Sequence, residues 1–386
     1  MHVLIIPSWY PRFSGDVSGS FFREQAIALK KSGLSVGLIC PQIKSLKDFK
    51  SILKKPYGLD IQLDEGINVL RWHSFNYLPK VKSFSKNHWI QIGLKLFESY
   101  MERYGKPDVI HVHSMLYAGY LAHQINTRYN IPYVITEHSS AFARGFVNDD
   151  VIESLKPVVE RSAKCVAVSH QFCKFLNNCF PKSNWLYIPN IVSENFFTVN
   201  ASFESKKNRI ISICHLNKNK NSELLIRAFE QVLKSSPNAE LVIGGEGDER
   251  IKLELLVKEL KIEKNVIFLG ALTRDQVKEE IQKSALFVVS SKYETFGVVV
   301  VEALALGKPV VSTKCGGPES IINSEVGLLV ENESILELSN GILYIYNNLE
   351  KYKPDYLRKY CLENFSETSV LSRLNIVYKD SSGFNE

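Results

Sequence analysis

Glu294-Thr295-Phe296-Gly297, followed by Glu302 and then by Gly316-Gly317-Pro318-Glu319, is the most informative stretch of this chain. Two carboxylates stand eight positions apart at a predicted loop-to-helix junction, and the second, glycine-rich stretch predicts another such junction opened by a proline. Helix N-termini offer free backbone N–H groups and a positive dipole end to an anion. Because carboxylates accept hydrogen bonds from hydroxyls, the stretch predicts a pocket for a sugar joined to phosphate.

Length and composition favour a globular protein of two domains. The chain has 386 residues, which is more than one ordinary hydrophobic core accommodates. Its content of 45% hydrophobic and 23% charged residues is typical of a globular protein. No apolar run reaches the roughly 18–20 residues of a membrane span, and the start Met1–Pro7 lacks the features of a signal peptide. The seven cysteines are scattered without a C-x-x-C pair. We therefore expect a cytoplasmic protein with thiols in a reducing compartment, rather than disulfides or a metal site.

The charge is unevenly distributed along the chain. Residues 1–193 hold 23 Lys and Arg against 14 Asp and Glu, a net +9, whereas residues 194–386 hold 24 against 27, a net −3. One interpretation is a peripheral contact with an anionic membrane surface at the inner face of the cell membrane; the other is an ordinary lysine-rich surface. Charge reversal at five lysines would weaken vesicle binding under the first interpretation: Lys44, Lys47, Lys50, Lys54 and Lys55. Nucleic acid is not an expected partner, because these lysines are not interleaved with aromatics on a recognisable module.

Strands and helices alternate in the first half. The predicted strands are Val3–Ile6, Val36–Cys40 (stopped by Pro41), Asp108–His111, Tyr133–Thr136 and Cys165–Val168, and the predicted helices are Ser20–Lys31 and a segment from about Tyr117. This alternation predicts a parallel sheet. Phe84–Arg103 has its large apolar side chains in helical spacing. Its apolar face is open to two interpretations, core packing and contact with a membrane or lipid acceptor.

A second alternation begins after about Ser193. The predicted strands are Arg209–Ile213, Glu240–Gly244, Val266–Leu269, Leu286–Ser290 and Pro309–Thr313, and the predicted helices are Glu223–Leu233, Glu249–Leu260 and Asp275–Lys283. Val298–Leu306 contains four consecutive valines, yet we expect a helix because Gly307-Lys308-Pro309 is typical of a helix stop. Ile43–Lys55 and Asn200–Asn208 are predicted loops. The fold class is therefore α/β, with two similar parallel-sheet domains facing each other across a cleft.

The order and spacing of these motifs resemble the family 4 (group 1) retaining glycosyltransferases of GT-B fold, from residue 1 to about 331. The resemblance implies two Rossmann-like domains. Residues 1–193 would bind the acceptor and residues 194–365 the nucleotide sugar. A C-terminal helix at about 366–386 would pack back on the first domain.

The resemblance assigns roles to the quoted stretch. Glu294 matches the first glutamate of the family's E-x7-E pattern and would bind donor-sugar hydroxyls, and Glu302 matches the second and would bind the ribose diol. Phe296, Gly297 and Val298 would present backbone N–H groups to the sugar or the diphosphate.

The family's two diphosphate-binding cations fall in the segment from Cys214 to Lys220. Lys220 aligns with the family lysine, and His215 stands where the arginine usually lies. A protonated histidine lacks the bidentate fork of arginine, so Lys218 is a possible substitute.

The N-terminal half carries three further matches. Gly19 belongs to Ser18-Gly19-Ser20, where the family often has two glycines, and would let the backbone approach phosphate, with Ser20 on the acceptor side. His113 matches the active-site histidine at a strand end, and His138 would line the acceptor side. His111, inside the strand, is expected to be a core histidine.

The implied reaction transfers a hexose from a nucleotide diphosphate sugar, UDP rather than GDP, to a hydroxyl of a glycan or lipid-linked sugar in bacterial surface polysaccharide biosynthesis. His113, Lys220 and Glu294 would be catalytic. No cofactor or metal is expected: no D-x-D motif is placed to hold one, and Asp149-Asp150 is interpreted as a solvated loop pair. Gly244–Gly247 lacks the third glycine of a dinucleotide fingerprint. Two alternatives remain open, a non-catalytic nucleotide-sugar-binding protein of this fold and a nucleotide-sugar epimerase.

Overall fold

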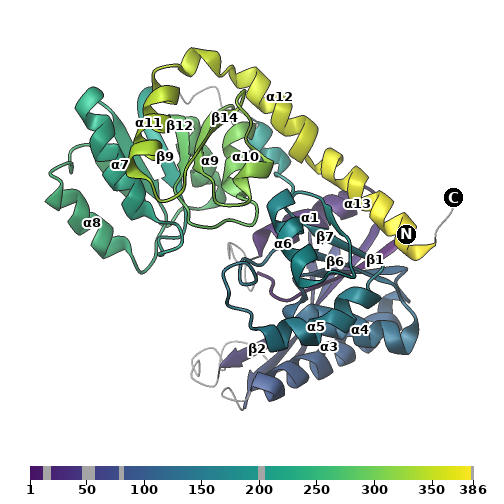
Figure 1. The fold of residues 1–386 in the computed structure, drawn as a ribbon. Helices are drawn as coiled ribbons and strands as arrows, with labels where there is room; N and C mark the ends of the chain where they lie inside the picture. The colour runs from purple at the N-terminus through teal and green to yellow at the C-terminus, as the bar shows by residue number, and fades with distance from the viewer. Residues whose placement is uncertain (12–18, 46–56, 78–81, 199–204, 384–386) are drawn as a thin grey trace. The chain divides into compact units, whose positions relative to one another are not determined.

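The computed structural model describes residues 1–11, 19–45, 57–77, 82–198 and 205–383. Its contacts divide the chain into two compact units (Figure 1). The N-terminal unit comprises Met1–Val168, Cys173–Ile188 and the chain from Leu371 onward, and the C-terminal unit comprises Ser169–Phe172 and Pro189–Val370. Ser18 and four of the five lysines of the membrane hypothesis, all but Lys44, lie outside the described residues.

The N-terminal unit is built on one sheet in the order β3-β4-β2-β1-β5-β6-β7-β8, parallel except for the antiparallel pair β3–β4. The strands are β1 (His2–Pro7), β2 (Ser35–Ser45), β3 (Gly58–Asp64), β4 (Ile67–Asn76), β5 (Val109–His113), β6 (Tyr133–Glu137), β7 (Lys164–Ala167) and β8 (Trp185–Tyr187). The helices are α1 (Ser20–Lys31), α3 (Lys82–Tyr104), α4 (Met115–Tyr129), α5 (Asp149–Arg161) and α6 (His170–Cys179). The predicted parallel sheet is confirmed.

Three expectations for this unit need correction or resolution. Pro41 does not stop the second strand: β2 pairs with β1 only as far as Leu38, so one edge is free at Pro41 and a residue without an N–H is tolerated. Asp149 and Asp150 are exposed but form the first turn of α5, which Asn148 caps, rather than a loop. The apolar side chains of α3 are buried, including Trp89 and Phe97, so core packing explains its pattern.

The C-terminal helix α13 (Glu367–Ser382) continues into the N-terminal unit. The Tyr378 hydroxyl and Nδ1 of His111 share a hydrogen bond of 2.6 Å, and both side chains are fully buried. Ser382 contacts the sulfur of Met1, and Figure 1 shows α13, in yellow, ending beside the chain's N-terminus. His111 is thus a core histidine, as predicted.

The C-terminal unit has a parallel sheet in the order β11-β10-β9-β12-β13-β14. The strands are β9 (Lys206–Ile213), β10 (Glu240–Gly244), β11 (Val266–Gly270), β12 (Ser284–Val289), β13 (Val310–Thr313) and β14 (Gly327–Val330). The helices are α7 (Ser222–Ser235), α8 (Arg250–Glu259), α9 (Arg274–Gln282), α10 (Val298–Ala305), α11 (Ile335–Tyr346) and α12 (Pro354–Phe365), with short 3-10 turns η1 (Glu194–Phe197), η2 (Pro318–Ser320) and η3 (Leu349–Lys351). Residues 206–208, expected in a loop, begin β9.

The four valines of the predicted helix do lie in a helix, α10. Its interior residues Val300–Ala305 are buried, and a helix that is apolar on nearly all sides is stable when it is enclosed by its own domain. Gly307, with φ of 73°, follows its C-terminus, as the helix-stop pattern predicted.

Within the described residues, no helix combines the length and apolar character needed to cross a bilayer. All seven cysteines are free thiols, and five of them are buried.

Candidate active site

The loop between β9 and α7 is shaped by the side chain of Asn217. Its amide oxygen accepts hydrogen bonds from the N–H groups of Asn219, at 3.0 Å, and Lys220, at 3.1 Å. Buried Leu216 anchors the loop to the sheet end. This local turn chemistry fixes the backbone from which the Lys220 side chain extends.

Gly245 and Gly247 explain the glycine run after β10. A Cβ at Gly245 would lie 1.8 Å from the carbonyl oxygen of Cys214, and one at Gly247 would lie 2.2 Å from that of Leu216. The run therefore allows this loop to pack backbone-to-backbone against the segment that carries His215 and Lys220.

Lys220 and Glu294 form an ion pair, with 2.5 Å between Nζ and Oε1. The same carboxylate oxygen accepts a hydrogen bond from Ser291 across 2.7 Å. Burial by itself would lower the pKa of Lys220, but attraction to Glu294 outweighs it, so the pKa is raised above its usual value. The structure thus brings together two of the predicted site residues, with the lysine held as a cation.

The Glu294 segment pairs with the glycine-rich loop after β13. Its N–H donates to the carbonyl of Cys315 across 2.7 Å, and Gly317 donates to the carbonyl of Glu294 across 2.8 Å. The carboxylate of Glu319 accepts the N–H of Gly316 across 2.9 Å. The predicted second helix start is therefore wrong in part: Pro318–Ser320 forms a single 3-10 turn, and the N–H groups of both glycines are bound by the protein itself.

The first turn of α10 does present backbone donors. Gly297 has φ of 97° and turns the chain into the helix, which begins at Val298. First-turn N–H groups have no acceptor within the helix, and those of Gly297 and Val298 have none elsewhere among the described residues. The side chain of Phe296, just before this turn, is buried, and its ring lies 6.0 Å from that of Phe365.

Glu302 lies one turn further into α10 and is fully buried. Its carboxylate is hydrogen-bonded by Arg274, the first residue of α9, whose guanidinium also lies 4.8 Å from the centroid of Phe196. Sequence reasoning missed Arg274. Thr273 and Gln276 form a capping box, a signal that could have located the start of α9 but not the partner of its first residue.

His215 and Lys218 are both exposed in the loop after β9. The His215 side chain has no hydrogen-bond or ionic partner in the described part of the chain. Within the described residues, no hydrogen bond or ion pair joins the His215 side chain to the Lys220–Glu294 pair.

In the N-terminal unit, His113 and His138 lie together at the carboxyl ends of β5 and β6. Nδ1 of His113 is 3.1 Å from Nε2 of His138, and the rings stack at 5.2 Å. His113 is fully buried, which lowers its pKa well below the usual value, assisted by the neighbouring histidines. Its Nε2 has no hydrogen-bond partner among the described residues. His113 is therefore a neutral imidazole with one buried ring nitrogen that has no partner among the described residues.

Gly19 and Ser20 begin α1 close to these histidines. Gly19 has φ of 77°, and a Cβ there would lie 3.1 Å from atoms of both Trp9 and Phe22. The Phe22 ring lies 4.9 Å from that of His113. The glycine thus permits the tight aromatic packing that encloses His113.

Glu137 is a residue of this region to which sequence reasoning gave no role. Its fully buried carboxylate accepts N–H groups of Met115, His138 and Ser139 at 2.7–2.9 Å. Burial raises its pKa, and these hydrogen bonds counteract the rise. The carboxylate fixes the backbone of His138 and the start of α4.

Two family models match adjoining parts of the chain. "Glycosyl transferases group 1" matches residues 194–360, and "Glycosyltransferase Family 4" matches residues 18–196. The chain belongs to the family 4 (group 1) glycosyltransferases. It is thus a transferase with the GT-B fold, as the motifs predicted.

Curated relatives and solved structures cover nearly the whole glycosyltransferase chain. An uncharacterized glycosyltransferase of Methanocaldococcus jannaschii is 29% identical over 81% of this chain and 86% of its own. TuaC of Bacillus subtilis, whose name assigns it provisionally to teichuronic acid biosynthesis, is 26% identical over 92% and 91%. Sucrose-phosphate synthase of Thermosynechococcus elongatus superposes with a TM-score of 0.81 at 20% identity, covering 98% of each chain. HepE of Anabaena in complex with UDP superposes with a TM-score of 0.75 at 18% identity, covering 97% of this chain and 99% of that one.

Among the described residues, no three His, Cys, Asp or Glu side chains gather in a metal-binding arrangement.

Proposed function

We propose that the protein is a retaining hexosyltransferase that moves a sugar from a nucleotide diphosphate sugar to an acceptor hydroxyl. The observation that carries the proposal is the Lys220–Glu294 ion pair beside the free N–H groups at the start of α10. A cation and oriented backbone donors suit a diphosphate, and a carboxylate suits sugar hydroxyls. Glu302, one turn further along the same helix, is the candidate for the ribose diol.

The chemical step needs stabilisation of the leaving diphosphate. As the glycosidic bond lengthens, negative charge grows on the leaving oxygen, and the Lys220 ammonium and the N–H groups of Gly297 and Val298 offset it. The acceptor hydroxyl attacks from the same face and gives its proton to the leaving oxygen. No enzyme nucleophile is required, and the cationic lysine takes the place of a metal ion.

His113 orients rather than titrates in this scheme. Because its pKa lies well below the usual value, the imidazole is neutral near pH 7 and accepts or donates a hydrogen bond to a donor-sugar hydroxyl without acting as an acid. His138, whose Nε2 lies 3.1 Å from Nδ1 of His113, and Ser20 at the start of α1 are the proposed acceptor-side residues.

UDP is the proposed donor nucleotide. The HepE structure, which shares the fold, was solved with UDP. TuaC's provisional pathway supports a surface polysaccharide as the destination, with a glycan or lipid-linked sugar as acceptor. The work would take place in the cytoplasm, at the inner face of the membrane.

One observation favours a second candidate, a nucleotide-sugar-binding protein without catalysis. His215 occupies the position of the family arginine, yet it is exposed, and its side chain has no hydrogen-bond or ionic partner among the described residues. In that case the donor would bind but not react.

A thermal-shift panel of UDP, GDP, ADP and CMP in EDTA tests the donor site. We expect one nucleoside diphosphate to stabilise the protein, by about 2.7 kcal/mol at a hundredfold excess over Kd. The effect should vanish in Lys220→Ala and Glu302→Ala. It should persist in the control Lys292→Ala. Lys292 lies in the same loop as Glu294, but its ammonium pairs with Glu333. Stabilisation by none of the four would contradict the proposal.

A further inference from the structure

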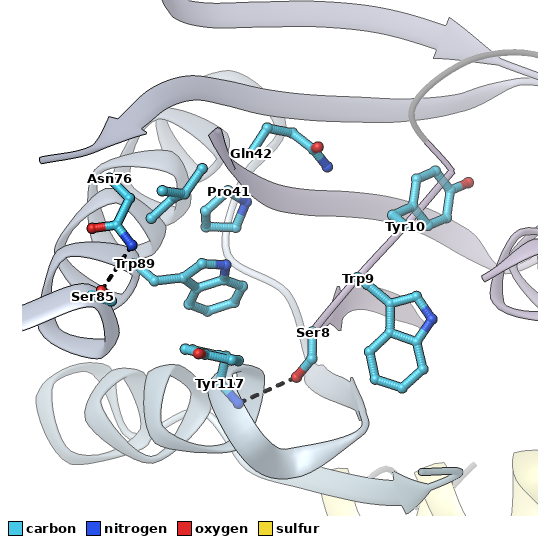
Figure 2. A pocket seen from close by; sticks show the side chains of 10 residues that line it. Ser8, Trp9, Tyr10, Pro41, Gln42, Asn76, Ser85, Trp89 and Tyr117 are labelled. Carbon is cyan, nitrogen blue, oxygen red and sulfur yellow. Dashed lines mark hydrogen bonds between the residues drawn. The ribbon is translucent and has the colours of Figure 1, made fainter. Parts of the chain in front are cut away.

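A cavity of about 400 Å³ lies in the N-terminal unit, and none of the predicted site residues lines it. It is formed where β1, β2 and β4 end and where α3 and α4 begin (Figure 2). Ligands of open parallel sheets bind at the carboxyl ends of the strands, and the volume lies within the range of about 300–1,000 Å³ typical of small-molecule pockets. The cavity therefore has the position and size of a binding site.

Aromatic side chains form much of its wall. Trp89 and Tyr117 lie with ring centroids 5.7 Å apart at 43°, and Figure 2 shows them close together on one side of the cavity with Trp9 on the other. Trp89 is 6% exposed and is held by the core, whereas Tyr117 is 39% exposed. A rigid indole beside an accessible phenol offers flat apolar surface to a ligand.

The polar groups of the cavity are neutral. Asn76 donates a hydrogen bond to Ser85 across 2.9 Å, and Gln42 adds a second amide. Among the described residues that line the cavity, none carries a charge. A phosphate or carboxylate placed here would be desolvated without a counter-charge, which is unfavourable. A neutral ligand with apolar faces and hydroxyl edges fits both features.

The cavity adjoins His113, the predicted active-site histidine, through Ser8 and Trp9. The Ser8 N–H donates to the carbonyl of His113 across 3.0 Å, and its hydroxyl accepts the N–H of Tyr117 across 3.3 Å. The Trp9 ring lies 5.1 Å from Phe22, which packs on His113. A ligand that packs on Trp9 would thus be separated from Phe22, which covers His113, by the Trp9 ring alone.

We propose that this cavity is a subsite for an uncharged sugar ring of the acceptor, with its apolar face on Trp89 and Tyr117 and its hydroxyls on Asn76, Ser85 and Gln42. That the bound sugar belongs to the acceptor rests on the proposed function. That the cavity binds a neutral sugar does not depend on it. The proposed occupant is thus a neutral sugar ring, and not a phosphate group or a lipid chain.

Saturation-transfer NMR tests the subsite in the full chain without donor. The probes are maltose, N-acetylglucosamine and methyl galactoside as neutral sugars, glucose 6-phosphate and glucuronate as anionic ones, and octanoate for a lipid chain. We expect at least one neutral sugar to bind, with affinity at least tenfold lower in Tyr117→Ala and in Asn76→Ala. The control Phe146→Ala removes a 69% exposed aromatic of the same unit and should change nothing.

Three results would overturn the subsite: no binding of any neutral sugar, binding of glucose 6-phosphate or octanoate in preference to the neutral sugars, or unchanged binding in both variants. Donor stabilisation is read separately in the nucleotide thermal-shift panel. Failure of the subsite therefore leaves that shift intact, whereas failure of the proposed function removes it and leaves the sugar signals.

Discussion

Nζ of Lys220 lies 2.5 Å from Oε1 of Glu294, although the residues are 74 positions apart. Three further hydrogen bonds join the same loops: the Asn219 side chain donates to the carbonyl of Tyr293 at 2.9 Å, the Ser290 hydroxyl to the carbonyl of Lys220 at 3.0 Å, and the Lys292 N–H to the carbonyl of Asn219 at 2.7 Å. The ion pair is therefore held by the backbones on both sides, which favours a preorganised charge over a chance surface contact.

Lys220→Ala should lower kcat/KM for sugar transfer by about 10²–10³-fold, because the leaving diphosphate loses a preorganised cation. Steady-state assays with the donor identified by thermal shift measure this. Lys292→Ala should stay within about twofold of wild type. Near-normal activity in Lys220→Ala would remove the ion pair from the mechanism.

The Arg274–Glu302 pair should show energetic coupling. Arg274→Ala removes a cation from a fully buried carboxylate, and we expect a loss of about 2 kcal/mol, below the 3–5 kcal/mol of fully buried pairs because the arginine side chain is 35% exposed. With Glu302→Gln in the background the same change should cost at least about 1 kcal/mol less. Urea unfolding of the four proteins gives the cycle. Additive losses would show that the two charges do not interact.

Gly317→Ala should disrupt the donor site without contacting the donor. A Cβ at Gly317 would lie 2.3 Å from the carbonyl oxygen of Phe296, so the loop after β13 must move away from the Glu294 segment. The affinity for the nucleotide, measured by thermal shift, should fall at least tenfold. Gly145→Ala is the control for backbone strain outside the donor site: its φ is 71°, but its Cβ would meet nothing within 4 Å. An unchanged affinity in Gly317→Ala would mean that the loop pairing is dispensable.

Stability should fall as pH drops below about 6.5. Burial lowers the pKa of His111 to about 3 and that of His113 well below the usual value. In the unfolded chain both histidines take up protons as pH falls through about 6.5, whereas in the folded chain they stay neutral. Each should therefore cost about 1.4 kcal/mol between pH 7.5 and 5.5.

His113→Asn should reduce this pH dependence by the share of one histidine, and thermal unfolding at the two pH values measures it. His170→Asn, which alters an exposed histidine, should leave it unchanged. A dependence identical in wild type and His113→Asn would show that His113 is not buried neutral.

Local patterns predicted much of the fold. The apolar spacing located α1 at Ser20–Lys31, and the stop after Leu306 identified α10 despite its valines. The β3–β4 hairpin was missed because its turn uses Glu65-Gly66, both with positive φ, rather than the Asn-Gly or Asp-Gly pair that marks such turns.

Only the site residues that belong to a short sequence motif could be predicted. Lys220, Glu294 and Glu302 lie in recognisable motifs. The Arg274–Glu302 pair and the enclosure of His113 by Phe22 arise from packing between distant segments, which no local pattern encodes. The role of Gly317 likewise depends on how closely another backbone approaches.

The most direct test of retaining transfer uses water as the acceptor. Proton NMR follows hydrolysis of UDP-sugars by the protein in EDTA. It identifies which anomer of the sugar is released first, before mutarotation mixes the two. The account predicts slow release of the α anomer from an α-linked donor, lost in Lys220→Ala. Initial release of the β anomer, or equal release by Lys220→Ala, would contradict it.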